Sequence, residues 1–311
     1  MNQRIRIGVD LGGTKTEIVA LGEAGETLLR RREATPANDY AATLALVARL
    51  VRDTVNELGS DPKPACGPAA FSVGIGTPGS PSPHTGLMRN SNSTCLNGRP
   101  FQGDLERELG TAIRIANDAD CFALSEARDG AARGAATVFG VILGTGVGGG
   151  IAVNGQLLSG PNAIAGEWGH NPLPWPRDEE RPGLACYCGK HGCIETFLSG
   201  PGLALDHERA GGAKLQAEEI VARADTGEES ALLALRRYED RLARALAGVI
   251  NLLDPDIIVL GGGMSNVPSL YGRVPALLRQ WVFSDVVRTQ LARNAHGDSS
   301  GVRGAAMLWP L

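Results

Sequence analysis

The stretch RIRIGVDLGGTKTEIVAL, from Arg4 to Leu21, consists of two apolar, β-branched runs joined by a glycine-rich turn. Apolar residues alternate along the first run at Ile5, Ile7 and Val9, as they do in a half-buried strand. The turn therefore joins strand to strand, whereas a dinucleotide-binding G-x-G-x-x-G segment or a P-loop would lead into a helix. We expect a hairpin whose backbone N–H groups can hold phosphate in the manner of an anion nest.

Three side chains in this turn carry chemistry that suits a nucleotide. Asp10 stands at the end of the first strand, where its carboxylate could hold a hydrated Mg2+ ion. Thr14 offers a hydroxyl and Lys15 offers a positive charge. The alternative interpretation is an ordinary β-turn without a ligand.

The same pattern recurs in VFGVILGTGVGGGIAV, from Val138 to Val153, where a glycine-rich turn again separates two apolar runs. Gly144 to Gly150 would form a second phosphate-binding turn. Two such hairpins, one opening each half of the chain, predict a duplicated architecture that holds phosphate between its halves. A third glycine run, Gly261 to Ser265, follows the buried strand expected at Ile257–Leu260 and would let a flat adenine ring approach the backbone.

A cluster of cysteines between the second and third glycine runs predicts a metal site. Cys186, Cys188 and Cys193 form a C-x-C-x4-C pattern, and His170 lies upstream in the segment G-E-W-G-H. Three thiolates and one imidazole complete a tetrahedral zinc site with no position open to water, so the zinc would be structural. His191, inside the cysteine cluster, is an alternative fourth ligand, and free buried thiols or a disulfide are alternatives to zinc.

Acidic side chains beside these motifs are candidates for catalysis and sugar binding. Glu167 and Glu195 bracket the cysteine cluster, so a folded zinc loop would fix the positions of both. Asp118 follows a strand expected at Ile113–Ala116 and precedes a helix expected from Ala119. We interpret it either as the N-cap of that helix or as a general base at the end of a strand.

Two further segments could meet a ligand through backbone or amide groups. Gly79 belongs to G-T-P-G-S, a tight turn after a strand, where the backbone could approach a ligand closely. Asn92 lies in the polar loop 89–100, which is otherwise interpreted as an ordinary surface loop.

The composition of the 311-residue chain excludes some classes of function. It is 43% hydrophobic and 21% charged with a net charge of -4, which argues against a nucleic-acid surface rich in Lys and Arg. Residues 134–166 carry no charge, but glycines interrupt the segment before the roughly 20 apolar residues that a membrane span needs. With no apolar signal core at the N-terminus, we expect a cytoplasmic protein with reduced cysteines.

Apolar periodicity predicts further elements. We expect a helix at Tyr40–Leu58, a loop at Asp61–Pro68, a strand at Ala70–Ile75, helices at Leu203–Ala224 and Glu229–Leu253, and a final helix from near Ser299 to Leu308. The helix at 229–253 has a broad apolar face that suits either the core or a subunit interface, so we expect a homodimer.

Taken together, the motifs resemble those of the ROK sugar kinases, within the wider actin-like (ribonuclease H-like) ATPase group. They are, in order, D-L-G-G-T-K, N-D-A-D, G-T-G-V-G-G-G, G-E-W-G-H, C-x-C-G-x-x-G-C-I-E and V-L-G-G-G-M-S, and they cover essentially the whole chain. Within the family, the segments N-S-N-S-T-C-L-N-G-R-P-F, G-E-W-G-H-N-P-L-P-W and H-G-D-S-S-G-V-R-G-A-A look most like bacterial fructokinases, also called manno(fructo)kinases.

This resemblance implies an α/β fold of two domains with a central cleft and a structural zinc site. The smaller domain would comprise residues 1–118 with about 298–311, and the larger domain, with the zinc motif, residues 119–297. The residues implied to bind ATP and Mg2+ are Asp10, Gly12, Gly13, Thr14, Lys15, Gly144, Thr145, Gly146, Gly148, Gly261, Gly262, Gly263 and Met264. Those implied to bind the sugar are Gly79, Asn92, Asn117, Asp118, Glu167, His170 and Glu195. The resemblance also favours His170 as the fourth zinc ligand.

The expected reaction is ATP-dependent phosphorylation of a hexose at its 6-hydroxyl, with Asp118 as the general base. The resemblance favours D-fructose, giving fructose 6-phosphate, with mannose as a second substrate. N-acetyl-D-glucosamine or glucose is the alternative substrate on the same scaffold. Related fructokinases carry Trp after N-S-T where this chain has Cys95, a departure that bears on the sugar preference and not on the reaction. A sugar-responsive repressor is the alternative of another class, and we disfavour it because few residues precede Asp10 to form a helix-turn-helix.

Overall fold

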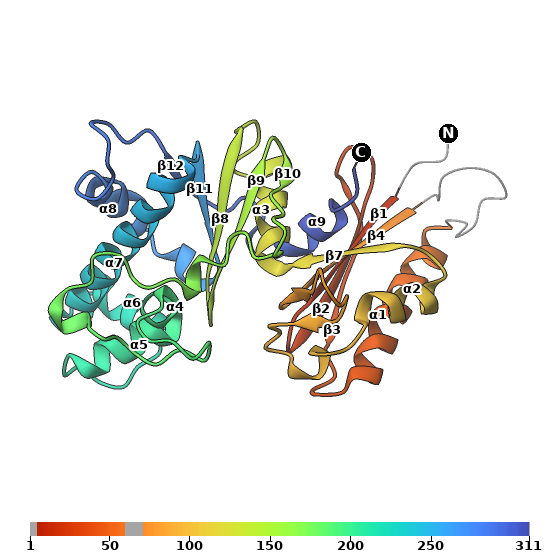
Figure 1. Cartoon of the computed structure of the whole chain (residues 1–311), viewed down its shortest axis with the longest axis horizontal. Coiled ribbons are helices and arrows are strands. Elements are labelled where there is room, and N and C mark those ends of the chain that lie inside the picture. Colours follow the sequence, from red (N-terminus) through yellow and green to blue (C-terminus); the bar gives the residue numbers. More distant parts are fainter. Residues whose placement is uncertain (1–4, 60–70, 311) are drawn as a thin grey trace. The chain divides into compact units, whose positions relative to one another are not determined.

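The computed structural model describes residues 5–59 and 71–310. These residues form two compact units (Figure 1). The first contains the chain through Gly130, residues 156–165 and the chain from Asp298 onward, and the second contains residues 131–155 and 166–297. The expected boundary at residue 118 would separate the helix that begins there from the first unit, so the exact domain boundary stays a prediction. The loop expected at 61–68 and Ala70 lie outside the described residues.

In the first unit a mixed sheet has the strand order β3-β2-β1-β4-β7. Its strands are β1 (Ile5–Leu11), β2 (Lys15–Leu21), β3 (Thr27–Ala34), β4 (Phe71–Thr77) and β7 (Ile113–Asn117), and a small ribbon pairs β5 (Ser80–Pro81) with β6 (Met88–Arg89). β1 and β2 are antiparallel, whereas β4 lies parallel to β1 and β7 lies parallel to β4. The carboxyl ends of β1, β4 and β7 therefore meet at one edge of the sheet.

Helices cover both faces of this sheet. The elements are α1 (Tyr40–Glu57) and α2 (Phe101–Leu109) on one face, and α3 (Asp118–Arg128) and α9 (Ser300–Ala306) on the other (Figure 1). α9 lies directly on the strand backbones, because a Cβ atom added at Gly8 would come within 2.2 Å of the Val302 carbonyl oxygen. A Cβ atom at Gly74 would lie only 1.9 Å from the Ala305 carbonyl oxygen. Glycine at these two positions is what permits the close packing.

The second unit repeats this sheet topology. Its strands run in the order β9-β8-β11-β12, namely β9 (Val147–Val153), β8 (Thr137–Leu143), β11 (Ile257–Gly261) and β12 (Gln290–Arg293). β8 and β9 form an antiparallel hairpin, and β11 lies parallel to β8. Each unit thus starts from a strand–glycine turn–strand hairpin whose first strand pairs in parallel with a later strand. The predicted duplication of the hairpin is confirmed.

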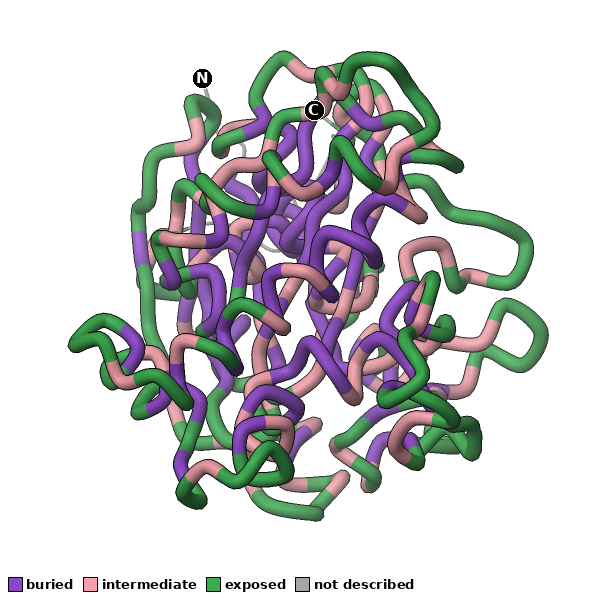
Figure 2. Tube along the Cα trace, turned by 90° about the vertical axis from the view of Figure 1, so that its left-hand side faces the viewer, coloured by how far each residue is buried: buried purple, intermediate pink, exposed green. Residues whose placement is uncertain are grey.

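The helices of the second unit pack around one core. They are α4 (Ile194–Leu198), α5 (Gly200–Arg209), α6 (Ala217–Asp225), α7 (Glu229–Leu253) and α8 (Ser269–Leu278). α7 has the predicted bounds, and its side chains Leu235, Leu242 and Leu246 are buried in this core. These leucines are therefore not exposed to a second subunit, and the homodimer stays a prediction without support from them. Figure 2 shows the buried positions concentrated along the inner strands and helix faces.

The remaining elements are short. They are β10 (Gln156–Leu157) and the 3-10 helices η1 (Thr94–Leu96), η2 (Trp168–His170), η3 (Asp178–Glu180), η4 (Gly263–Asn266) and η5 (Gly297–Ser299). Among the described residues, no helix combines the length and the apolar character that a membrane crossing requires.

Two predicted helix bounds were wrong. The helix expected over 203–224 is two helices, because the chain breaks at Gly211, whose φ of 90° favours glycine. Gln216 and Glu219 then start α6 with a capping box. The helix expected from Ala119 begins one residue earlier, and its N-cap is Asn117, whose side chain accepts a hydrogen bond from the Ala119 N–H at 2.9 Å.

Candidate functional site

One threonine, Thr35, fixes the glycine turn between β1 and β2 through hydrogen bonds. The Gly12 N–H donates to the Lys15 carbonyl oxygen at 3.0 Å, which closes the turn. Thr35, just after β3, donates its hydroxyl to the Gly12 carbonyl oxygen at 2.8 Å and its N–H to the Thr14 carbonyl oxygen at 3.0 Å. Gly13, Thr14 and Lys15 remain exposed at the surface of the first unit. The turn is thus fixed on one side and presented to solvent on the other, as a phosphate-binding turn requires.

Asp10 and Asp118 come together at the carboxyl-terminal edge of the first sheet. Asp10 lies in β1, and Asp118 directly follows β7. Burial raises the pKa of Asp10 to about 7, and the nearby charges of Asp118 and then Glu17 act in the same direction. Carboxylate oxygens such as those of Asp10 are the ligands that a hydrated divalent cation takes. The structure therefore fits the predicted Mg2+ position at Asp10.

Asn117 and Asp118 are neighbours in the sequence but have different positions relative to α3. Asn117 is the helix cap, so the N-cap interpretation of Asp118 was wrong. Asp118 is the first residue of α3, and its Oδ1 accepts a hydrogen bond from the Ala119 N–H at 2.8 Å.

The turn at Gly79 and the loop at Asn92 are built as one substructure. Gly79 has a φ of 74°, and a Cβ atom there would lie 2.3 Å from the Arg89 carbonyl oxygen. The Ser91 N–H donates to Asn97 Oδ1 at 2.9 Å, and the Asn97 amide donates back to the Ser91 carbonyl oxygen at 2.9 Å. This paired contact fixes the loop while Asn92 stays exposed. Cys95 is half-buried and packs against the core beneath β1 and α1.

In the second unit, Glu195 of α4 contacts the second glycine turn. The Gly144 N–H donates to the Gly146 carbonyl oxygen at 2.9 Å, which closes the turn. The Val147 N–H donates to Glu195 Oε2 at 3.0 Å, and a Cβ atom at Gly146 would lie 2.7 Å from the same oxygen. A predicted phosphate-binding turn and a predicted sugar-binding carboxylate are therefore in direct contact.

The third glycine run adjoins the second. Gly262 has a φ of 78°, and a Cβ atom there would lie 2.5 Å from the carbonyl oxygen of Leu143, the residue before Gly144. The Ser265 hydroxyl donates to the Gly262 carbonyl oxygen at 2.7 Å, and this hydrogen bond fixes the start of η4. The predicted adenosine segment, 261–264, and the predicted phosphate turn thus lie side by side within one unit.

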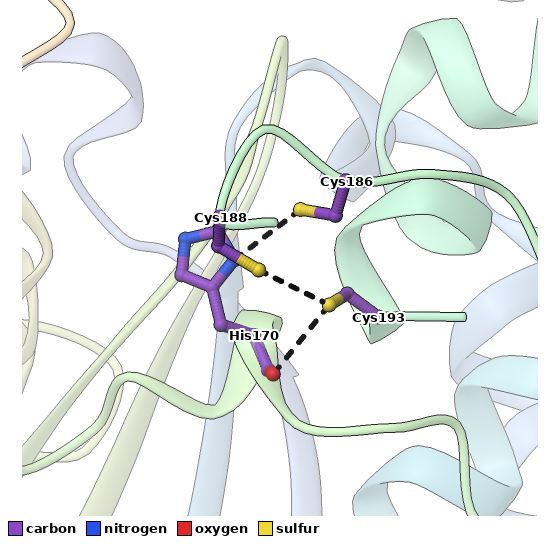
Figure 3. Close-up of side chains that lie close together, drawn as sticks. All are labelled: His170, Cys186, Cys188 and Cys193. Atoms are coloured by element: carbon purple, nitrogen blue, oxygen red, sulfur yellow. Dashed lines mark hydrogen bonds between the residues drawn. The ribbon is translucent and has the colours of Figure 1, made fainter. Parts of the chain in front are cut away.

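Four side chains form the candidate metal centre (Figure 3). The ligand atoms of His170, Cys186, Cys188 and Cys193 all lie within 4.8 Å of one another. Cys188 Sγ lies 3.5 Å from Cys193 Sγ, and Cys186 Sγ lies 3.5 Å from His170 Nδ1. Ligands of a tetrahedral zinc ion stand about 3.4 to 3.8 Å apart, given bonds of about 2.0 to 2.3 Å. The set fits zinc, and His191 is not part of it.

Two functional features of this region were missed by sequence reasoning. The first is Tyr187, whose hydroxyl lies 2.9 Å from His170 Nε2 and whose ring meets the imidazole edge-on at a centroid distance of 5.0 Å. Desolvation of its hydroxyl, and then the charges of Glu195, Cys186 and Glu167, raise the pKa of the Tyr187 phenol to about 12, although most of the residue's surface is exposed. Its position between two candidate ligands was the only sequence signal for it.

The second missed feature is a buried ion cluster that holds the segment between His170 and Cys186. Glu180, in η3, binds Arg241 at 2.8 Å and Arg244 at 2.7 and 2.8 Å. Both arginines come from α7, and the Arg244 side chain is fully buried. Desolvation acts against the charge of Glu180, yet the hydrogen bonds from Arg244 and Arg241 lower its pKa to about 2. No sequence motif links residues this far apart.

Comparisons with known proteins agree with this geometry. The model of the ROK family matches residues 6–311. An N-acetyl-D-glucosamine kinase of Vibrio cholerae serotype O1 is 39% identical over 305 residues, which cover 97% of this chain and 98% of that protein. A ROK hexokinase structure from Thermus thermophilus superposes with a TM-score of 0.84 at 26% identity, covering 98% of this chain and 97% of that one. A ROK family glucokinase from Streptomyces griseus, solved with glucose and AMPPNP, gives a TM-score of 0.76 at 27% identity, with 98% of each chain covered.

Proposed function

Because this chain belongs to the ROK family and is an ATP-dependent sugar kinase, we propose that it phosphorylates the 6-hydroxyl of N-acetyl-D-glucosamine. The observation that carries this choice is the near full-length similarity to N-acetyl-D-glucosamine kinases, repeated at 38% identity with the Escherichia coli strain HS protein. The fructose preference expected from the sequence is not confirmed, and these relatives favour the alternative. Cys95, which replaces the fructokinase Trp, also points away from fructose.

The chemistry begins with Asp118. Its carboxylate stands at the start of α3, beside Asp10 and at the carboxyl end of the parallel strands, which is where ligands bind in α/β sheets. We assign to Asp118 the role of accepting the proton of the attacking 6-hydroxyl. Asp10 is assigned to the hydrated metal ion that accompanies ATP. ATP supplies the phosphoryl group, and Mg2+ would offset its negative charge.

Backbone N–H groups of the glycine turns would hold the phosphates. The turn at 12–15 is closed by its own hydrogen bond and by Thr35, and the turn at 144–146 is closed by the hydrogen bond from the Gly144 N–H to the Gly146 carbonyl oxygen. Donors fixed in advance need little reorganisation when charge develops on the phosphoryl oxygens, and this lowers the barrier. Residues 261–264, next to the second turn, would border the adenosine.

Glu167, His170 and Glu195 are assigned to the other sugar hydroxyls, with Gly79, Asn92 and Asn117. One residue can serve both zinc and sugar, because His170 Nδ1 faces the cysteines while Nε2 points away from them. Zinc would be structural, since four protein ligands leave no position for water. It would hold the loop 186–193 against Glu195, whose Oε1 lies 4.0 Å from Cys186 Sγ.

A coupled ATP assay on four sugars tests the proposal. We expect kcat/KM for N-acetyl-D-glucosamine to exceed that for D-fructose, D-mannose and D-glucose by at least about tenfold, which corresponds to roughly 1.4 kcal/mol of transition-state discrimination. A fructose value equal to or above that for the aminosugar would contradict the substrate choice. Absence of turnover on every hexose would contradict the assigned reaction.

A further inference from the structure

Tyr187 is an exposed aromatic residue whose hydroxyl contacts a residue of the proposed sugar site. We propose that the Tyr187 hydroxyl occupies the hydrogen-bonding position on His170 Nε2 that a hydroxyl of the hexose takes on binding, so that the hexose must displace Tyr187. This inference rests on the proposed function, since it assumes that His170 contacts the sugar. It adds a residue that sets the affinity for the sugar.

The two nitrogens of His170 have different neighbours, and this fixes where a proton must lie. Nδ1 lies 3.5 Å from Cys186 Sγ on the side of the cysteine cluster, so its lone pair is the one that a metal would take. With a metal on Nδ1, Nε2 would carry the proton and would donate it to Tyr187 Oη, which lies 2.9 Å away. One N–H group makes one strong hydrogen bond, so a sugar oxygen and Tyr187 Oη compete for it.

The surroundings of Tyr187 match those proposed for a sugar hydroxyl. The charges of Glu195 and Glu167, the two other side chains assigned to the hexose in this unit, act on its phenol. A neutral O–H group among an imidazole and two carboxylates resembles a hexose hydroxyl in its donor and acceptor groups. Tyr187 therefore resembles a hexose hydroxyl in its hydrogen-bonding groups.

Displacement of Tyr187 costs little packing. The residue is 80% exposed, and its ring contact is the edge-on one with the imidazole. Rotation of the side chain into solvent would give up mainly one hydrogen bond and that ring contact. A net hydrogen bond is worth little enough that a hexose with several partners can displace it.

A second explanation makes a different prediction. A partner on the outer nitrogen of a zinc-bound histidine commonly orients the ring, and its loss weakens metal binding about 10- to 100-fold. If Tyr187 only orients His170, its removal must reduce zinc affinity and weaken sugar binding. If Tyr187 competes with the sugar, its removal must strengthen sugar binding and leave zinc in place.

The test is calorimetric titration of N-acetyl-D-glucosamine into zinc-loaded protein without nucleotide, comparing wild type with Tyr187→Phe. We expect the Kd for the sugar to fall about 2- to 10-fold in the variant, the range of one net hydrogen bond. Zinc content by elemental analysis should stay at the wild-type level. Tyr187→Ala, which also removes the ring contact, should bind at least as tightly as Tyr187→Phe. The matched control is Tyr40→Phe, which removes a phenol bonded to Asp104 in the first unit and should leave the Kd unchanged.

Equal or weaker sugar binding by Tyr187→Phe would overturn the inference, and loss of zinc from the variant would assign Tyr187 to ring orientation instead. These results leave the proposed function intact, because wild type still binds the sugar. Absence of sugar binding by wild type would refute the proposed function itself, and the inference with it.

Discussion

At the scale of single residues, Asn117 and Asp118 show how adjacent polar side chains take separate roles. Asn117 caps α3, and this leaves Asp118 in the first turn with a carboxylate near Asp10. The sequence N-D-A-D predicted a functional carboxylate, but it could not decide which of the two residues caps the helix. Either side chain can accept the hydrogen bond, and only the path of the backbone selects one.

The substitution Asp118→Asn tests the assigned base. We expect kcat to fall by about 10^2- to 10^4-fold, because the amide cannot accept the proton of the sugar hydroxyl. The Kd for N-acetyl-D-glucosamine should change little, since an amide has a similar shape. Turnover and sugar binding are measured separately, by coupled assay and by calorimetry.

The control for this variant is Asp39→Asn, because Asp39 caps α1 with its side chain at 3.0 Å from the Ala42 nitrogen and Asn caps equally well. This control should keep wild-type kcat. Retention of more than about one per cent of wild-type kcat by Asp118→Asn would exclude Asp118 as the base.

Glu180 gives a residue-scale prediction about pH. Its folded pKa of about 2 lies below the value of about 4.3 expected in the unfolded chain. A depressed pKa contributes stability that is fully present above the unfolded value and is lost as pH falls through the folded value. The free energy of unfolding should therefore fall as pH drops from about 5 to about 2, and urea unfolding at several pH values measures this.

The variant Glu180→Gln should lose up to about 3 to 5 kcal/mol of stability at neutral pH, because it removes the buried carboxylate that Arg241 and Arg244 share and leaves them only Asp206 and Asp240 as partners. It should also depend less on pH over the acid range than wild type. Glu57→Gln is the matched control, since Glu57 pairs with Arg31 at the exposed surface and should cost less than about 1 kcal/mol. Equal losses in the two variants would contradict the role of the buried cluster.

At the scale of elements, the seating of α9 on β1 and β4 depends on glycine. The substitution Gly74→Ala places a methyl group against the Ala305 carbonyl oxygen, and we expect it to destabilise the protein by about 1 to 3 kcal/mol or more. Gly103→Ala, in the first turn of α2 with no atom within 4 Å of the added Cβ, should instead stabilise by up to about 0.5 to 1 kcal/mol. Thermal unfolding compares the stabilities of the two variants. A destabilised Gly103→Ala together with an unaffected Gly74→Ala would contradict the role of glycine in seating α9.

The loop that carries the candidate zinc ligands gives the second element-scale prediction. Cys186→Ser should reduce zinc content and thermal stability first, and activity only as a consequence, because the assigned zinc is structural. Cys95→Ser, a half-buried cysteine outside the cluster, should keep full zinc content. Wild-type protein that contains no zinc on elemental analysis and is fully active would contradict the assignment.

The sequence predicted helices correctly where the apolar periodicity was long. It failed where the local backbone conformation ended a helix. The helix α7 has 25 residues and a continuous apolar face, so its bounds followed from the pattern. The break between α5 and α6 depends on two adjacent glycines and a capping box, which compete with an apolar periodicity that continues through them. The contacts of Tyr187 and Glu180 could not be predicted from the sequence, because their partners are distant in sequence and only tertiary packing brings them together.

At the scale of the whole molecule, repetition of the hairpin is the feature that the sequence predicted best. Both sheets place a glycine turn between antiparallel strands and a parallel strand beside the first of them. A single glycine turn is also explained by an ordinary β-turn, but two such turns between paired apolar strands together indicate phosphate chemistry. Sugar preference depends instead on a few side chains in loops, and for that reason the fructose prediction was not confirmed while the kinase prediction was.

Phosphorus-31 NMR of the reaction product, correlated to the sugar protons, tests the central claim most directly. Incubation of the protein with ATP, Mg2+ and N-acetyl-D-glucosamine should give one new phosphate ester coupled to the two protons at C6 of the sugar. An ester coupled to the proton at C1, C3 or C4, or phosphate released as the free ion without any ester, would contradict the account.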